Sequence, residues 1–374
     1  MRILTVIGTR PEAIKMAPVL LRLKQEAGVT AKLCVTAQHR EMLDQVLAHF
    51  DLKADFDLDL MRKAQGLAYI TTAVLEGIEK ILREFTPDWV LVQGDTSTTF
   101  AAALASFYQR IKVAHVEAGL RTGNIYSPWP EEMNRKLTTQ LSSVHFPPTE
   151  QSRKNLLREG VAESHILVTG NTVIDALFHT RDIVSDQGQV ERSIASQFPF
   201  LDPSRRLILV TGHRRENFDG GLERVFRGLA ILARRLDVQI VFPVHLNPKV
   251  QEAAKVVLSG TERVHLIPPV PYREFVWLMT RSHFIVTDSG GVQEEAPSLG
   301  KPVLVTRENT ERPEAVEAGT VELVGTDEMK LVERATLLLD DGAHYRAMSN
   351  AINPYGDGQA AERIVRRLVH GTNS

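Results

Sequence analysis

The chain has 374 residues, too many for one ordinary hydrophobic core, so we expect two domains. Its 44 basic and 46 acidic residues give a net charge of −2, which argues against nucleic acid or an anionic membrane as the main partner. The single cysteine, Cys34, excludes an intramolecular disulfide and a cysteine-based zinc site. No apolar run approaches the roughly 20 residues that span a bilayer, and the first residues lack a signal-peptide pattern. We therefore expect a cytoplasmic protein, with Cys34 buried in a strand.

Short apolar segments alternate with longer segments of helical periodicity along the whole chain. In the first half, strands are predicted at residues 3–7, 33–36, 89–92, 113–116 and 144–146. In the second half they are predicted at 207–211, 239–243, 264–267, 284–287 and 303–306. The helical stretches include residues 13–25, 97–109, 222–235 and 273–281. This alternation predicts an α/β fold of two Rossmann-like, doubly wound domains that face a cleft.

The strand pattern restarts near residue 207, after a polar stretch at 185–203. We place the domain boundary earlier, at Gly170, where a strand-like run ends. The expected domains are an N-terminal Rossmann-like domain at 1–170, a C-terminal one at 171–355 and a final helix at 356–374. Residues 356–361 match a loose Gly-x-Gly-x-x-Ala pattern but follow no strand, so they do not predict a dinucleotide site.

In the first half, charged residues stand directly after predicted strands, where open α/β sheets bind ligands. Arg10 and Lys15 flank a predicted helix start, which favours an anion, although ordinary surface cations fit the pattern equally. Asp95 and Glu131 are candidate acid–base groups, but Asp95 also fits a helix N-cap and Glu131 the dipole of its own helix. Glu117 ends an apolar strand and has no such structural explanation, so it indicates a functional carboxylate.

In the second half, the strand at 284–287 leads into Ser-Gly-Gly at 289–291, and a helix follows at once. The glycines let the backbone approach a ligand, and the N–H groups of a helix start can hold phosphate oxygens. Glu295, about one turn later, is placed to contact a ribose, while a plain glycine turn is the alternative. Arg312 and His213 follow strands of the same half and add donors for phosphate. The histidines lack the spacing of a metal site, and nothing else predicts a metal or NAD.

Seven blocks of sequence, taken together and in order, resemble the bacterial non-hydrolysing UDP-N-acetylglucosamine 2-epimerases. They are residues 8–15, 38–45, 116–132, 211–217, 243–248, 287–312 and 353–358. The resemblance implies a two-domain architecture of the glycosyltransferase-B type, a homodimer, no cofactor, and a final helix that crosses back to the N-terminal domain. It implies epimerisation of UDP-N-acetylglucosamine to UDP-N-acetylmannosamine at carbon 2, through UDP elimination and 2-acetamidoglucal. The product would supply N-acetylmannosamine units for cell-surface polysaccharides.

The resemblance also implies roles for single residues. The residues implied to be catalytic are Asp95, Glu117, Glu131 and His213. The residues implied to bind the UDP-sugar are Arg10, Lys15, Asp95, Glu117, His213, Phe275, Ser289, Gly290, Gly291, Glu295 and Arg312. Some relatives bind a second UDP-N-acetylglucosamine as an activator, in a pocket matched here by Gln38, Glu131, Arg214 and His245. Glu41 and Ala64 stand where those relatives carry Gln and Arg, and the loss of the Arg removes a phosphate ligand from that pocket.

Three other functions fit parts of the pattern. A UDP-sugar-dependent glycosyltransferase would use the same fold and UDP pocket, but it needs an acceptor as a second substrate. A non-catalytic UDP-sugar sensor would need the phosphate-binding groups without the three carboxylates together. A hydrolysing epimerase would release UDP and the free sugar.

Overall fold

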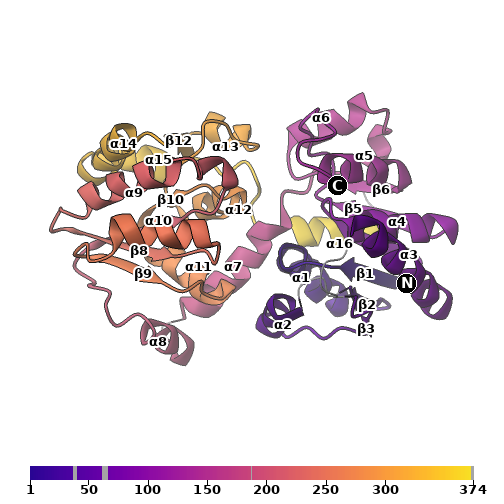
Figure 1. The fold of residues 1–374 in the computed structure, drawn as a ribbon. Coiled ribbons are helices and arrows are strands. Elements are labelled where there is room, and N and C mark those ends of the chain that lie inside the picture. The colour runs from indigo at the N-terminus through magenta and orange to yellow at the C-terminus, as the bar shows by residue number, and fades with distance from the viewer. Residues whose placement is uncertain (37–39, 61–65, 187, 372–374) are drawn as a thin grey trace. The chain divides into compact units, whose positions relative to one another are not determined.

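The computed structural model describes residues 1–36, 40–60, 66–186 and 188–371. The chain divides into two compact units (Figure 1). Unit 1 contains residues 1–176 and 355–374, and unit 2 contains residues 177–354. Each unit is built on one parallel six-stranded sheet, with the orders β3-β2-β1-β4-β5-β6 and β12-β11-β10-β7-β8-β9. When each sheet is numbered from its own first strand, both have the order 3-2-1-4-5-6 of a Rossmann fold, which confirms the predicted class.

The strands of unit 1 are β1 (Arg2–Ile7), β2 (Thr30–Val35), β3 (Phe56–Asp57), β4 (Trp89–Gln93), β5 (Lys112–Val116) and β6 (Val144–Phe146). Its helices are α1 (Arg10–Gln25), α2 (Arg40–His49), α3 (Leu67–Phe85), α4 (Ser97–Tyr108), α5 (Glu131–Leu141), α6 (Glu150–Arg158), η1 (Glu163–His165) and α16 (Ala360–His370). Helix α7 (Thr172–Val184) begins in unit 1 and ends in unit 2.

The strands of unit 2 are β7 (Arg206–Thr211), β8 (Val238–Pro243), β9 (Val264–Ile267), β10 (Ser282–Thr287), β11 (Val303–Val305) and β12 (Val321–Leu323). Its helices before β10 are α8 (Gln189–Ala195), η2 (Arg215–Asn217), α9 (Gly221–Leu232), α10 (Pro248–Leu258) and α11 (Tyr272–Arg281). Those after β10 are α12 (Gly290–Glu295), η3 (Ala296–Leu299), α13 (Pro313–Glu317), α14 (Glu328–Asp340) and α15 (Gly342–Ser349).

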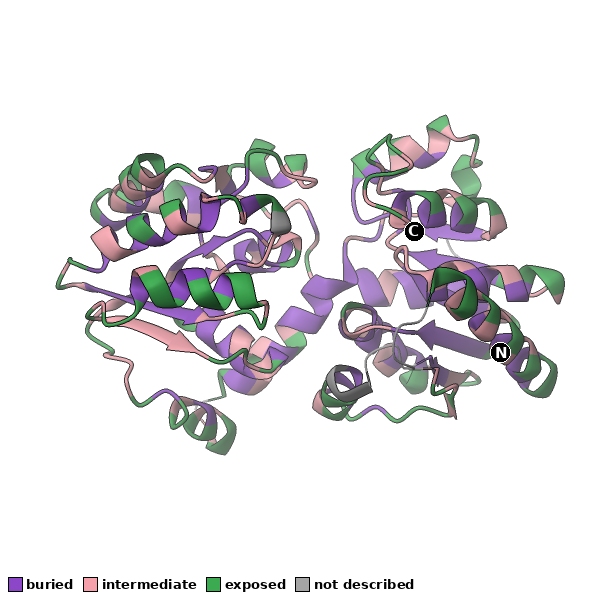
Figure 2. Cartoon of the chain, in the orientation of Figure 1, coloured by how far each residue is buried: buried purple, intermediate pink, exposed green. Residues whose placement is uncertain are grey.

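The central strands are apolar at successive positions because helices cover both faces of each sheet. In β1, Ile3, Leu4, Val6 and Ile7 are all at most 2% exposed. Figure 2 shows the inner strands buried and the outer sides of many helices exposed. Cys34 in β2 is fully buried, as predicted, and burial raises the pKa of its thiol to about 12. That thiol is therefore protonated at neutral pH and has a packing role.

Two strands escaped the sequence prediction, and each lies at the edge of its sheet. β3 has two residues and β12 has three. An edge strand pairs on one side only, so it needs neither a long apolar run nor strong β-propensity. The strands at the opposite edges, β6 and β9, were predicted, whereas β3 and β12 each contain an acidic residue that interrupts the apolar pattern.

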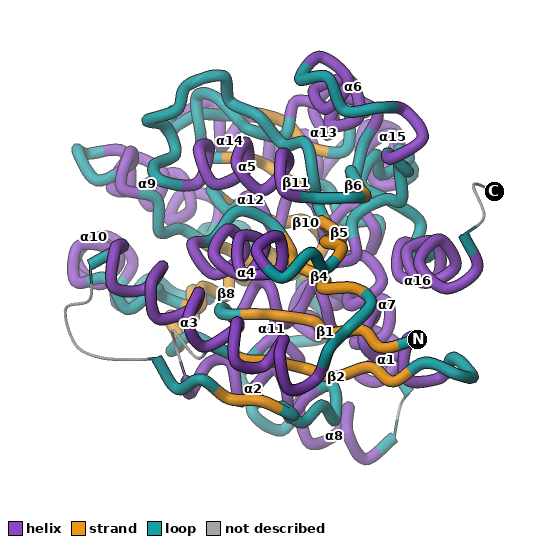
Figure 3. Tube along the Cα trace, turned by 90° about the vertical axis from the view of Figure 1, so that its right-hand side faces the viewer, coloured by secondary structure: helices purple, strands orange, loops and turns teal. Residues whose placement is uncertain are grey.

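The last helix, α16, packs against α1 within unit 1 (Figure 3). Its first N–H groups, those of Ala360 and Ala361, donate to the carboxylate of Asp175 at 3.2 and 2.8 Å. The chain reaches α16 past Gly356, whose φ is +136°. A Cβ on Gly170 would lie 3.2 Å from the Cα of Gly356, so the two segments approach closely where both residues lack side chains.

No helix in the described part of the chain is both long enough and apolar enough to cross a bilayer.

Candidate functional site

The strand order places a crevice at a defined point of each sheet. In unit 1 the order reverses at the pair β1 and β4, and in unit 2 at the pair β7 and β10. Ligands of open α/β sheets bind at the carboxyl ends of the strands at such a reversal. The residues that follow these four strands, and their neighbours, are therefore the candidate site residues of each unit.

The loop after β1 is closed by a carboxylate of the chain itself. Glu12 is 2% exposed and accepts the backbone N–H groups of Gly8 at 2.7 Å and Thr9 at 2.6 Å. Burial raises the pKa of Glu12, and hydrogen bonds from Thr96, Gly8 and Thr9 oppose that shift. The helix start that the sequence marks as an anion site thus already contains a carboxylate. An external phosphate in unit 1 would meet the side-chain cations of α1 rather than these two amides.

Glu117, directly after β5, has a carboxylate fixed by two side chains. Nζ of Lys15 lies 2.5 Å from Oε2 of Glu117, and the amide of Gln93 donates to the same oxygen. Both side chains of the ion pair are largely buried, at 15% and 10% exposed. Glu117 also has a φ of +61°, a region that costs a residue with a Cβ about 1–2 kcal/mol. Strain of this kind concentrates at functional sites, which agrees with the interpretation of Glu117 from the sequence.

Helix α5 contains Glu131 and also supplies the two side chains that bind Asp95. Oδ2 of Asp95 accepts a hydrogen bond from Nε of Arg135 at 2.9 Å, and the side chain of Asn134 donates to the Asp95 backbone oxygen at 2.9 Å. The N-cap of α4 is Thr96, so Asp95 does not act as the cap. Glu131 is the first residue of α5, where its charge also favours the helix dipole.

In unit 2, a buried carboxylate orients the imidazole of His213. Asp288, fully buried after β10, accepts the backbone N–H groups of His213 and Arg214 at 2.9 and 2.8 Å. Nδ1 of His213 lies 3.2 Å from Oδ1 of Asp288. Burial raises the pKa of Asp288, but hydrogen bonds from His213 and from the two backbone amides outweigh it, and the net shift is downward. Since Nδ1 faces the carboxylate, Nε2 is the ring nitrogen directed to a ligand.

Two guanidinium groups approach the start of α12. A Cβ on Gly290 would lie 3.8 Å from Nη2 of Arg312 and 4.0 Å from Nη2 of Arg214. The carboxylate of Glu294, inside α12, accepts a hydrogen bond from Nε of Arg312 and so orients it. The N-cap of α12, Ser289, makes no side-chain capping hydrogen bond. Unit 2 therefore combines an uncapped helix start with two cations, and this arrangement suits a phosphate group.

The carboxylate expected to contact a ribose is also oriented. The hydroxyl of Tyr272 donates to Oε1 of Glu295 at 2.6 Å, and Glu295 is 7% exposed. Its other oxygen, Oε2, lies 3.8 Å from where a Cβ on Gly291 would stand. Phe275 lies on α11, three residues after Tyr272 and therefore on the same side of the helix, and is partly buried.

The residues matched to an activator pocket are only partly described. His245 stacks on His213 with ring centroids 5.4 Å apart, and Arg214 follows His213 in the same loop. Glu131 belongs to unit 1. Gln38 and Ala64 lie outside the described residues, and the side chain of Glu41 is not described.

Several residues that shape the site were missed by sequence reasoning. Asp288 follows an apolar strand, as Glu117 does, so the same signal would have found it. Arg135 and Tyr272 lie inside helices, and only their tertiary contacts reveal their roles. In the described part of the chain, no group of three or more His, Cys, Asp or Glu residues is arranged to hold a metal ion.

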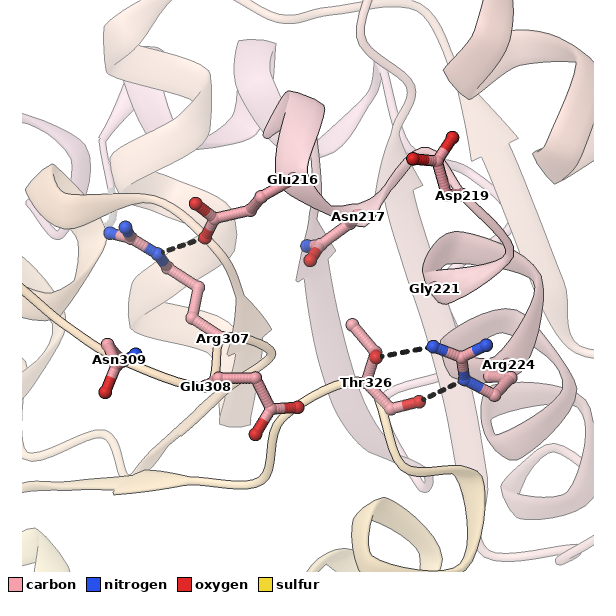
Figure 4. Close-up of a pocket in the computed structure, with 9 residues that line it drawn as sticks. All are labelled: Glu216, Asn217, Asp219, Gly221, Arg224, Arg307, Glu308, Asn309 and Thr326. Carbon is pink, nitrogen blue, oxygen red and sulfur yellow. Dashed lines mark hydrogen bonds and ion pairs between the residues drawn. The ribbon is translucent and has the colours of Figure 1, made fainter.

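A cavity of about 230 Å³ is lined by residues 216–224, residues 307–309 and Thr326 of unit 2 (Figure 4). Its two arginines are already engaged, since Arg307 pairs with Glu216 at 2.6 Å and Arg224 donates to the hydroxyl and carbonyl oxygens of Thr326. Three carboxylates outnumber the two arginines along its wall. This cavity is therefore a poorer anion site than the start of α12.

Comparison with known proteins identifies the family of the chain. The profile of a family described as UDP-N-acetylglucosamine 2-epimerase matches residues 21–369. The UDP-N-acetylglucosamine 2-epimerase of Escherichia coli K12 is 59% identical over 369 residues, 98% of each chain. The chain belongs to this family. The UDP-GlcNAc 2-epimerase of Neisseria meningitidis, crystallised with UDP-GlcNAc, is 51% identical, covers 99% of this chain and 100% of its own, and superposes with a TM-score of 0.91. The Methanocaldococcus jannaschii UDP-GlcNAc 2-epimerase, in complex with UDP-GlcNAc and UDP, is 36% identical with 99% and 100% coverage and a TM-score of 0.81.

The backbone strain at Glu117 of this epimerase predicts a difference in stability between two substitutions that remove its carboxylate. Glu117→Gly and Glu117→Ala remove the same carboxylate, but only alanine keeps a Cβ at a φ of +61°. We expect the alanine variant to be less stable than the glycine variant by about 1 kcal/mol, measured by urea unfolding. Glu333, exposed inside α14, provides the control, because there the glycine variant should be the less stable by about 1 kcal/mol. Equal stabilities of the two Glu117 variants would show that the backbone is not strained.

Proposed function

We propose that this UDP-N-acetylglucosamine 2-epimerase works by eliminating UDP and adding it back. A base removes the proton from carbon 2, the bond from carbon 1 to the diphosphate oxygen breaks, and its electron pair leaves with UDP. The carbon 1–carbon 2 double bond of 2-acetamidoglucal forms. Protonation of carbon 2 from the opposite face, with return of UDP to carbon 1, gives UDP-N-acetylmannosamine. The product would supply N-acetylmannosamine units for cell-surface polysaccharides.

Elimination is proposed because carbon 2 has no adjacent carbonyl to acidify its proton. A free carbanion there is implausible, whereas a departing diphosphate accepts the electrons. The protein then needs cations and N–H donors around the diphosphate, and acid–base groups at carbon 2.

The observation that carries the proposal is the convergence of His213 and Arg312 with the start of α12. In the proposal, these groups and the N–H groups of Gly290 and Gly291 hold the diphosphate. The carboxylate behind His213 keeps Nε2 directed outward. Glu295 binds the ribose, and Phe275 lies near the base. Arg10 and Lys15 of α1 add positive charge for the departing UDP.

The carboxylates of unit 1 supply the proton transfers in this proposal. Asp95 and Glu117 have fixed side chains, each with an oxygen tied to a cation, and Glu131 begins α5. The proton leaves one face of carbon 2 and a proton is added to the opposite face. The reaction therefore requires at least two acid–base groups, or one that moves. The three carboxylates are proposed together as the source of these groups.

The remaining parts of the proposal concern partners and location. A second UDP-N-acetylglucosamine would bind as an activator beside His213, where Arg214 and His245 lie, and Ala64 would weaken that site by removing a cation. The unpaired, buried Cys34 is in keeping with a reducing cytoplasmic location.

We also propose a homodimer that forms through α4 and α5. These helices pack together and expose four large apolar side chains: Phe107 and Tyr108 at 57% and 63%, Met133 at 37% and Leu137 at 39%. Exposed apolar side chains gathered on neighbouring helices are typical of protein–protein interfaces. A second copy would cover them in an isologous contact.

The first test of the proposed function is UDP affinity. Arg312→Ala and His213→Ala should each weaken UDP binding by about 1.5–3 kcal/mol, because each removes a strong donor to the diphosphate. Isothermal titration calorimetry measures this directly. Arg224→Ala is the control. It removes an arginine of the 230 Å³ cavity that already bonds to Thr326, so the affinity for UDP should be unchanged. Wild-type affinity in both site variants would remove these residues from the proposed site.

The second test follows the proton at carbon 2. Turnover of UDP-N-acetylglucosamine alone in heavy water should place deuterium at carbon 2 of the product, and long incubation should release traces of UDP and 2-acetamidoglucal, both seen by NMR. Asp95→Asn, Glu117→Gln and Glu131→Gln should lower turnover roughly 100-fold or more, with smaller effects on binding. Protium retained at carbon 2 would exclude the mechanism. A transferase or sensor would leave the sugar unlabelled, and a hydrolysing enzyme would release UDP and free sugar stoichiometrically.

The dimer is tested by sedimentation velocity. The double change Phe107→Glu and Tyr108→Glu should convert the wild-type dimer into a monomer, because two charges would have to be buried in the interface. Leu236→Glu, at an isolated position 76% exposed in unit 2, should leave the dimer intact. A monomeric wild-type protein would contradict the proposal.

A further inference from the structure

The carboxylate of Asp95 is bound by the side chain of Arg135, which has no part in the reaction as proposed above. Arg135 lies on α5 with its side chain 8% exposed. Its Nε donates to Oδ2 of Asp95 at 2.9 Å, and its Nη2 lies 2.8 Å from the same oxygen. Two coplanar donors on one oxygen fix the direction of the carboxylate. The Asp95 side chain remains 27% exposed, so it is accessible to a ligand.

Arg135 is itself anchored on its other side. Its Nη1 donates to Oε2 of Glu132 at 3.1 Å, and the Glu132 side chain is fully buried. Glu132 also accepts the backbone N–H groups of Thr122 at 3.1 Å and Gly123 at 3.2 Å. Moving this carboxylate would leave a buried charge without partners, which costs several kcal/mol. The guanidinium therefore cannot follow Asp95 if Asp95 turns.

The backbone at Asp95 is held as well. The Asn134 side chain donates to the Asp95 carbonyl oxygen, and Nε2 of His115 lies 2.7 Å from the carbonyl oxygen of Gly94. His115 is buried, and burial lowers its pKa to about 4, so it is a neutral imidazole that can donate from Nε2. The N–H of Gly94 donates to Val116 at 3.0 Å. The turn is thus fixed from β5 and α5, and Arg135 constrains the direction of the carboxylate.

We infer that Arg135 is a positioning residue for epimerisation. Arg135 holds Asp95 in the orientation needed at the sugar, and Glu132 in turn holds Arg135. The inference rests on the proposed function. It predicts a loss in turnover rather than in UDP binding, because the UDP moiety is assigned to residues other than Asp95 and Arg135. A purely structural ion pair would change stability instead.

The main variant is Arg135→Gln, and Arg121→Gln is its matched control. The Arg121 side chain is 9% exposed, pairs with Glu159 at 2.6 Å and donates to Thr139 of the same helix, α5, at 2.9 Å. Among the described residues, Arg121 makes no hydrogen bond or ion pair with Asp95, Glu117 or Glu131. For each variant, kcat and KM for UDP-N-acetylglucosamine, UDP affinity and melting temperature are measured.

Arg135→Gln should lower kcat roughly 100-fold, as expected when a reacting group is misplaced by about 1 Å. Its KM and UDP affinity should stay within about threefold of wild type. Arg121→Gln should lower the melting temperature and leave kcat within about threefold. If the two variants lose kcat equally, or if Arg135→Gln changes only stability, the inference is overturned.

A double-mutant cycle connects the effect to Asp95. In the Asp95→Asn background, adding Arg135→Gln should lower kcat by less than about threefold, since the group it positions is already disabled. Fully multiplicative losses would show that Arg135 acts elsewhere. A wild-type protein that leaves carbon 2 unlabelled in heavy water would refute the proposed function itself, and that outcome is distinct from failure of the Arg135 variants in an active enzyme.

Arg135→Lys covers the case in which the glutamine variant does not fold. A lysine keeps the positive charge beside Glu132, but one ammonium cannot reach both carboxylates with the geometry of a guanidinium. We expect about a tenfold loss in kcat, with stability near wild type. Wild-type kcat in this variant would overturn the inference.

Discussion

Buried carboxylates hold the loops at the carboxyl ends of the strands, and the rest of the site depends on them. Glu12, Glu132 and Asp288 are at most 2% exposed, and each accepts two backbone N–H groups of a neighbouring loop. A carboxylate removed from water must find its partners in the protein, because an uncompensated buried charge costs several kcal/mol. The loops that supply these partners consequently have little freedom. The reactive side chains attached to them are fixed by the same constraint.

The two units use the same sheet topology and differ in what their loops offer. In unit 1 the amides after β1 are occupied by Glu12, and the exposed chemistry is that of carboxylates paired with cations. In unit 2 Asp288 occupies the amides after β7, and the start of α12 is left with two guanidinium groups at Gly290. In the proposed function, one strand order thus supports acid–base groups in one unit and an anion site in the other, as expected when function resides in loops added to a common fold.

The proposed elimination places heavy demands on orientation. In that proposal, charge moves from carbon 1 to the diphosphate while a proton leaves carbon 2, and donors fixed in advance would stabilise this change without reorganising. Five of the groups with a proposed part in this step have a neighbour that sets their direction. In unit 2, Asp288 orients His213, Glu294 orients Arg312, and Tyr272 orients Glu295. In unit 1, Arg135 orients Asp95. Lys15 orients Glu117, whose backbone is also strained.

The sequence by itself determined the α/β class, the central strands and the family, because buried parallel strands leave long apolar runs and the motifs after them are specific. It also marked Glu117 through a local signal, a carboxylate at the end of an apolar strand. It could not find β3 and β12, since these edge strands are short and an acidic residue interrupts the apolar pattern of each. Only the tertiary structure identified Thr96 rather than Asp95 as the cap of α4, and placed Arg135 on Asp95. The cap is a local hydrogen bond from the Thr99 N–H to Thr96, and the sequence offered two adjacent residues that could form it. The Arg135–Asp95 pairing joins residues 40 positions apart, and it depends on how α5 packs beside the sheet rather than on any local periodicity.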